Sequence, residues 1–127
     1  MSIPISKILK SEEMMMKSIN LKDYEEIRRV AQLYVDGCAK GDGNYMKPAF
    51  HASATINGAP IQTLFDGADQ LGKTNSVGKI DILDVVSDIA VIRITLENFH
   101  GEDYVDFHAL RKDENGWKIM AKVFTGA

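Results

Sequence analysis

Hydrophobic side chains recur at helical spacing from residue 20 onward, which predicts a helix at the front of the domain. Asn20 is a good N-cap, and Gly41 is a natural stop. Asp42 can cap a second, short helix whose length Pro48 limits. The apolar face of the first helix is predicted to carry Ile27, Val30, Ala31, Tyr34, Val35 and Cys38. These signals predict a helical hairpin.

The middle of the chain is predicted to hold one strand and one short helix. Residues 51–57 alternate loosely between apolar and polar side chains and end at Gly58-Ala59-Pro60, which is typical of a strand that enters a turn. Residues 61–71 place Leu64, Phe65 and Ala68 at helical spacing.

The pattern becomes that of β-strands from Lys79 to the end of the chain. Four strands are predicted, at residues 80–86, 89–98, 103–111 and 117–125, joined by turns. Helices followed by an antiparallel meander indicate an α+β fold, with the helices on one face of the sheet.

The simplest hairpin registers, Arg111 with Trp117 and Phe99 with Glu102, sort the meander into two faces. The more apolar face carries Ile92, Ile94, Leu96, Val105, Phe107, Ala109, Trp117, Ile119, Ala121 and Val123, and we expect it to meet the helices. The other face, with Asp106 paired to Lys122, suits a subunit interface. We therefore expect a homodimer through the face that carries Arg93, Tyr104, Asp106, His108 and Lys122.

Length and charge narrow the class of protein. A chain of 127 residues predicts one domain, which we place at residues 19–127, after an N-terminal arm at 1–18. Met14-Met15-Met16 in this arm could be a short anchor, a swapped element or a disordered segment. The net charge of −3, with scattered basic residues, argues against nucleic acid and membrane partners. A single cysteine fits a reducing compartment, and we expect a cytoplasmic protein.

Several segments in order resemble a known family. They are Tyr34-Val35-Asp36-Gly37-Cys38, Gly41-Asp42, Ala49-Phe50-His51, Tyr104-Val105-Asp106-Phe107, Gly116-Trp117-Lys118-Ile119 and Lys122-Val123-Phe124. Together they are similar to the putative lumazine-binding branch of the nuclear transport factor 2-like superfamily. The resemblance implies a cone, or cystatin-like roll: a strongly bent antiparallel sheet wrapped round the N-terminal helices, with a cavity at the open end and usually a homodimer.

Enzymatic members of this superfamily use carboxyl groups and a tyrosine inside an apolar cavity, and this implies where to look for chemistry. The weak catalytic candidates are His51, Asp106 and His108. Our register turns Asp106 away from the helices, which favours a structural ion pair with Lys122 over an acid/base role. Asp106 and His108 share one face of their strand, but two ligands without a third do not predict a metal site, and we expect neither metal nor cofactor.

Residues 67–74, GADQLGKT, match the phosphate-binding loop pattern. That loop needs a buried strand before it and a helix that begins at the Lys-Thr pair. The sequence around it predicts neither, so we do not expect a nucleotide site.

These arguments predict a protein that binds a small hydrophobic or aromatic molecule. The expected pocket residues are Tyr34, Phe50, His51, Asn57, Phe65, Phe107 and Trp117. The alternative is an isomerase, cyclase or dehydratase in which a pocket carboxylate or histidine acts as acid or base. A register shifted by one residue would favour the alternative, because it would move Asp106 and His108 to the helix side.

Overall fold

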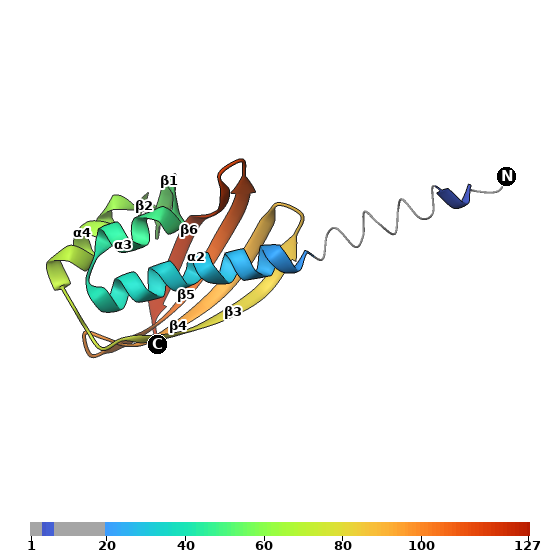
Figure 1. Ribbon diagram of the computed structural model, residues 1–127. Helices are drawn as coiled ribbons and strands as arrows, with labels where there is room; N and C mark the ends of the chain where they lie inside the picture. The colour runs from blue at the N-terminus through green and yellow to red at the C-terminus, as the bar shows by residue number, and fades with distance from the viewer. Residues whose placement is uncertain (1–3, 7–19) are drawn as a thin grey trace.

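A long helix, α2 (Leu21–Lys40), lies across the concave side of a curved sheet of six strands (Figure 1). This computed structural model describes residues 4–6 and 20–127. The predicted arm therefore lies outside the described residues except for positions 4–6, and the proposed arm–domain boundary stays a prediction. Within the described ranges, no helix is long and apolar enough to cross a membrane.

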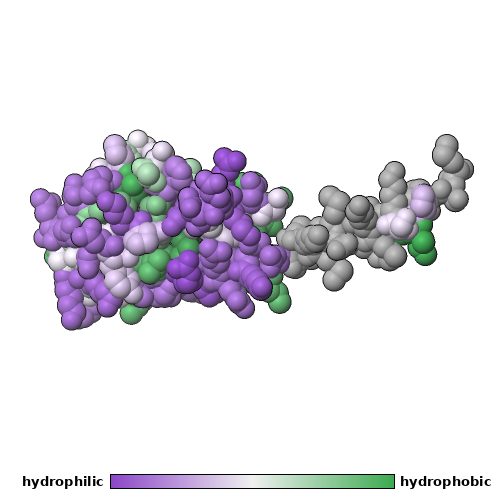
Figure 2. All heavy atoms as spheres, turned by 45° about the horizontal axis from the view of Figure 1, so that its top comes forward, coloured by the Kyte–Doolittle hydropathy of each residue, from purple (hydrophilic) through white to green (hydrophobic). Residues whose placement is uncertain are grey.

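The predicted helical hairpin is confirmed, together with its capping residues. The Asn20 side chain accepts a hydrogen bond from the Lys22 amide, and Gly41 ends α2 with a left-handed φ of 63°. Asp42 caps α3 (Gly43–Met46), which continues into a short 3₁₀ helix, η1 (Lys47–Ala49). The polar side of this helical layer faces outward, so the surface in Figure 2 is mostly hydrophilic.

The strands follow as β1 (Phe50–Ile56), β2 (Ala59–Pro60), β3 (Val77–Val86), β4 (Ile89–Phe99), β5 (Glu102–Asp113) and β6 (Gly116–Gly126). Helix α4 (Gln62–Leu71) lies between β2 and β3 in the chain. The strand order is β2-β1-β6-β5-β4-β3, and the predicted meander forms one antiparallel block. The sheet is not antiparallel throughout, because β1 pairs with β6 in parallel.

A bulge between β4 and β5 shifts their register by one residue. The predicted pair Phe99–Glu102 is present at the turn, but further along Leu96 pairs with Tyr104 and Ile94 with Asp106. The irregularity lies between Leu96 and Phe99, a stretch in which Asn98 has a left-handed φ of 59°. As a result, Asp106 lies beside Ile94. The predicted register, which continues from Phe99–Glu102 without a bulge, would place it beside Thr95.

A second bulge lies between β5 and β6. Leu110 pairs with Ile119, but the next pair is Ala109 with Ala121, so Met120 is the extra residue of β6. The extra residue reverses the alternation of sides along β6. Trp117 before the bulge and Lys122 after it therefore both point into the protein.

These registers correct part of the predicted assignment of the two sheet faces. Ile92, Ile94, Leu96, Trp117 and Ile119 lie inside as predicted, but β5 and the part of β6 after its bulge are turned the other way. The inner face holds Ala90, Ile92, Ile94, Leu96, Asp106, His108, Leu110, Trp117, Ile119 and Lys122, all buried. The prediction that Phe107 and Val123 meet the helices is wrong, since they are 49% and 57% exposed on the outer face. The predicted dimer face is wrong for Asp106, His108 and Lys122, because all three are buried within the chain.

A carboxylate at the start of α2 holds the helix to the far end of the sheet. Asp23 accepts hydrogen bonds from the Trp117 indole at 3.0 Å and from the Lys112 ammonium at 2.8 Å. Burial raises the pKa of Asp23, but these two donors outweigh it and hold the pKa below 3.8. Trp117 is thus a buried anchor between helix and sheet.

The segment that matches the phosphate-binding loop pattern has a different structure. Gly67 lies within α4, and the helix ends at Leu71, before Lys73 and Thr74. No helix begins at the Lys-Thr pair. The segment therefore lacks the backbone geometry that binds phosphate.

Two glycines allow the end of α2 to touch the end of α4. A side chain at Gly41 would overlap the backbone of Gly72 and would also be strained by the left-handed φ. We predict that Gly41→Ala lowers the free energy of unfolding by about 2 kcal/mol or more. Gly67→Ala, in an open position within α4, should raise it by about 0.5–1 kcal/mol. Urea titrations of both variants test this pair, and equal effects would contradict it.

Candidate functional site

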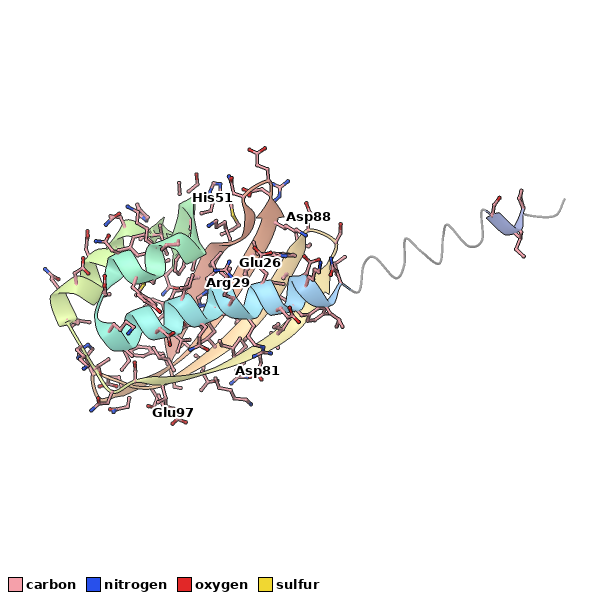
Figure 3. The ribbon with its side chains drawn as sticks, viewed as in Figure 1. Glu26, Arg29, His51, Asp81, Asp88 and Glu97 are labelled. Carbon is pink, nitrogen blue, oxygen red and sulfur yellow. The ribbon has the colours of Figure 1, made fainter. Side chains whose placement is uncertain are left out.

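A small chamber of about 150 Å³ lies between α2 and the inner face of the sheet. Its wall is formed by Tyr34, Cys38, Ile56, Leu96, Phe99, Tyr104, Asp106, Lys122 and Phe124. Leu96, Phe99 and Tyr104 belong to the end of the sheet where β4 turns into β5, the end at which Glu97 is labelled in Figure 3. Asp88, at the β3–β4 turn, marks the opposite end (Figure 3).

The Asp106 carboxylate is the centre of the chamber's polar groups. Its Oδ2 atom accepts a hydrogen bond from the Tyr34 hydroxyl at 2.6 Å. The same oxygen lies 3.3 Å from Nε2 of His108 and 3.5 Å from Nζ of Lys122. All four residues are at most 4% exposed, so these groups interact in an environment largely shielded from water.

One oxygen of this carboxylate remains without a partner. Within the described residues, Asp106 Oδ1 is buried and has no hydrogen bond, and the same holds for Nδ1 of His108. Buried polar atoms are nearly always paired in folded proteins, and leaving one unpaired costs about 1–3 kcal/mol. Oδ1 therefore keeps an unused capacity to accept a hydrogen bond or a proton.

Lys122 contributes a positive charge among aromatic rings. Its Nζ lies 4.0 Å from the centre of the Phe124 ring and 5.5 Å from that of Tyr34. Asn57 secures this part of β6, because its side-chain oxygen accepts from the Phe124 amide at 3.0 Å and its backbone amide donates to the Lys122 carbonyl. The amine is thus held in place on the chamber wall.

The environment shifts the pKa values of the four groups in different directions. Burial raises the pKa of Asp106, but His108, Lys122 and Tyr34 outweigh it and hold the pKa below 3.8. Burial lowers the pKa of His108 below 6.5, although Asp106 opposes the shift. Burial also lowers the pKa of Lys122 below 10.5 and, with Cys38 and Asp106, raises that of Tyr34 well above 10.0. At neutral pH this site contains a carboxylate, a neutral imidazole and a neutral phenol.

Cys38 also lines the chamber but is not a reactive thiolate. Burial raises the pKa of its thiol to about 12. The side chain therefore contributes a small, apolar surface to the wall.

Three of the predicted pocket residues lie together in a different place. Phe50, His51 and Phe65 line an open depression of about 560 Å³ beside β1 and α4. Figure 3 labels His51 on β1, where its Nδ1 accepts a hydrogen bond from the Ser53 amide at 3.0 Å. The depression is larger than the chamber, but the residues that line it include no buried titratable side chain.

The other predicted pocket residues are divided between the chamber and structural positions. Tyr34 lines the chamber, while Asn57 holds β1 to β6 beside it. Phe107 lies on the outer face, and Trp117 is bound to Asp23 near the start of α2. Within residues 4–6 and 20–127, no three His, Cys, Asp or Glu side chains are grouped so that they could hold a metal ion.

Sequence reasoning missed that Lys122, Tyr104, Phe99 and Phe124 line the chamber. The signal was present in the face that carries Tyr104, Asp106, His108, Lys122 and Phe124. That face combines charged groups with aromatic rings, which is typical of a ligand pocket as well as of an interface. Only the register decides between the two. The bulges set it together with the β5–β6 turn, where Trp117 pairs with Lys112 and the predicted pair with Arg111 is wrong.

Comparisons with known proteins agree on the family. Residues 22–125 match the family described as putative lumazine-binding. The aldolase FrzH of Cladobotryum is 28% identical over 120 residues, which cover 87% of this chain and 96% of the relative. A solved NTF2-like protein of unknown function from Shewanella baltica is 31% identical, with a TM-score of 0.77 over 84% of this chain and 95% of that one. Another from Methylobacillus flagellatus is 29% identical, with a TM-score of 0.81 over 85% and 94%.

The buried His108 makes stability depend on pH. Because its pKa is lowered in the folded state, the unfolded chain binds a proton near pH 6.5 that the folded chain does not. The free energy of unfolding should therefore fall as the pH drops below this value, by up to about 1.4 kcal/mol per pH unit. Denaturant titrations across this range should show a shallower fall for His108→Asn than for the wild type. His100→Asn, at an exposed left-handed position, is the control, and identical pH slopes for wild type and His108→Asn would contradict the prediction.

Proposed function

The chain belongs to the putative lumazine-binding family of NTF2-like proteins, and from this premise we propose that its chamber binds a small carbonyl compound and catalyses proton transfer at the carbon beside the carbonyl. The observation that carries the proposal is the buried Asp106 carboxylate in the chamber wall, with one oxygen unpaired. This is the proton transfer used by isomerases, cyclases and dehydratases, the alternative interpretation of the sequence.

Asp106 is the proposed base. Its lowered pKa keeps the carboxylate ionised at neutral pH, and the free Oδ1 atom can accept a proton while Oδ2 stays bonded to Tyr34. His108 is a positioning residue, because its neutral ring can donate from Nε2 to Oδ2 and hold the carboxylate's orientation.

Removal of a proton beside a carbonyl places negative charge on the carbonyl oxygen, and the chamber contains a group that stabilises it. Lys122 supplies a positive charge for this oxygen, whereas the single proton of the Tyr34 hydroxyl stays on the bond to Asp106 Oδ2 and orients the base. In an environment shielded from water, such a fixed charge stabilises a developing oxyanion strongly.

The walls limit the size and polarity of the compound. A cavity of about 150 Å³ holds a molecule the size of benzene. Leu96, Phe99 and Phe124 supply apolar and aromatic contacts around the polar groups. We infer a small hydrophobic or aromatic aldehyde or ketone, or a longer compound of which one ring enters the chamber.

The sequence interpretation favoured binding over catalysis because it placed no carboxylate in a cavity. The position of Asp106 removes that reason. The relative named as an aldolase supports carbonyl chemistry, since an aldol reaction also begins with a proton removed beside a carbonyl. Binding without catalysis remains the outcome expected if Asp106 moves no proton.

We predict that the protein accelerates the exchange of α-hydrogens for deuterium in cyclohexanone dissolved in heavy water. Asp106→Asn should reduce this exchange by about 10²–10⁴-fold, because an amide is not a base at neutral pH. Proton NMR of the ketone measures the rate, and thermal unfolding checks that the variant is folded.

Asp88→Asn is the matched control, because Asp88 is exposed at the opposite end of the sheet. It should exchange cyclohexanone at the wild-type rate. If the wild type binds the ketone but exchanges its α-hydrogens no faster than buffer does, the proposed catalysis is wrong and the protein is a binding protein.

The homodimer expected from the sequence stays a proposal, now through the opposite side of the sheet. Phe107 pairs directly with Val123 across β5 and β6, and Val91 is exposed on the neighbouring strand β4. This outer stripe crosses three adjacent strands of the sheet. Apolar side chains exposed together on a sheet favour contact with a second copy of that sheet.

If this stripe forms the interface, Phe107→Glu should convert the dimer to a monomer, because it would bring two like charges together in an apolar contact. Light scattering after size-exclusion chromatography measures the mass. Gln70→Glu, which adds the same charge on the exposed side of α4, should leave the mass unchanged. A wild-type protein that is monomeric at all concentrations would exclude the dimer.

A further inference from the structure

Lys122 has the surroundings of a nucleophilic amine as well as those of a fixed charge. The residue is 4% exposed and lines the chamber, and its Nζ lies over the Phe124 ring, 4.0 Å from the ring centre. Its nearest charged partner is Asp106, at 3.5 Å. A lysine in an apolar pocket beside an acid/base group is the usual setting for Schiff-base chemistry.

We propose that Lys122 forms a Schiff base with the aldehyde or ketone that enters the chamber. The inference rests on the proposed function, because it requires that a carbonyl compound binds there. It names the substrate class more narrowly, since an aldehyde or an unhindered ketone forms an imine with an amine, whereas a carboxylic acid or an amide does not.

Lys122 and Asp106 donate and accept the protons that move between the protein and the substrate in this reaction. A proton passes from the Lys122 ammonium to Asp106, which leaves a neutral amine whose lone pair attacks the carbonyl carbon. A proton then moves from nitrogen to oxygen to give a carbinolamine. Asp106 returns its proton to the departing hydroxyl, so that water leaves and a positively charged iminium remains on Lys122.

Asp106 is then a carboxylate again, in the state needed for the next step. It removes the α-proton, the electron pair of the carbon–hydrogen bond forms a carbon–carbon double bond, and the iminium π electrons move to nitrogen. Reprotonation and addition of water reverse the sequence. The iminium keeps the positive charge of Lys122 close to Asp106, so the electrostatic balance of the buried site is preserved.

Burial also favours the neutral amine that the attack requires. The pKa of Lys122 is lowered, and burial is the main cause. Each unit by which an amine pKa falls raises the neutral fraction about tenfold at a pH below that pKa. Lys79, 75% exposed beside Asp81, is a suitable reference amine on the same chain.

The test traps the imine by reduction. Wild-type protein is incubated with cyclohexanone and sodium cyanoborohydride at neutral pH, and peptide mapping by mass spectrometry locates any added cyclohexyl group. We expect modification of Lys122 to exceed that of Lys79 by about tenfold or more. This measurement needs no variant, so it does not depend on whether a substituted chain folds.

Two variants separate the covalent step from the proton transfer. Lys122→Arg keeps the positive charge but cannot form an imine, so it should abolish the adduct and reduce α-hydrogen exchange by about 10²-fold or more. Lys79→Arg should change neither. Rescue of the exchange rate by free methylamine in Lys122→Arg would further support an amine nucleophile.

The outcomes distinguish this inference from the function on which it rests. One outcome would overturn the Schiff base but leave the proposed proton transfer intact. In that outcome Lys122 has no adduct, Lys122→Arg still exchanges α-hydrogens, and Asp106→Asn does not. If the wild type shows neither an adduct nor exchange, both the Schiff base and the proposed proton transfer are wrong. An adduct at Lys122, with exchange that does not depend on Asp106, supports the Schiff base and removes Asp106 as the base.

Discussion

A charged carboxylate inside the sheet is the constraint on which this architecture depends. Asp106 is 1% exposed, and burial of an unpaired charge is among the most unfavourable events in folding. Three groups from three elements stabilise it: Tyr34 from α2, His108 from β5 and Lys122 from β6. Because each contributes to one oxygen, the position of the helix over the sheet is fixed by the same contacts that define the chamber. The second carboxylate, Asp23, fixes the other end of α2 through Trp117.

The two bulges explain how such polar groups come to lie inside. Without the shift near Asn98, Asp106 would lie beside Thr95 instead of Ile94. If β6 were regular and lacked the bulge at Met120, Trp117 and Lys122 could not both point inward, because an odd number of positions separates them. Bulges of this kind redirect side chains, and they are common beside functional sites. Here they give an apolar sheet an inner face with a carboxylate, an imidazole and an amine.

Much of the fold could be predicted because its signals are local. The Asn20 cap, the Gly41 stop, the period of the first helix and the four strands of the meander each depend on neighbouring residues. The family resemblance was also confirmed, and it supplied the curved sheet that periodicity alone does not predict. The site depends instead on how strands align with one another. A shift of one residue exchanges the faces, so Phe107 was placed inside and Asp106 outside although both strands were identified correctly.

The residue that makes the β6 bulge has a consequence for how such proteins diversify. A single-codon insertion or deletion that no bulge absorbs would exchange the side chains presented to the interior over the rest of that strand, while its composition stayed almost the same. Lineages with this architecture could thus gain or lose an internal ionic cluster in one mutational event. Proteins that share this architecture are therefore expected to differ in chemistry more readily than in form.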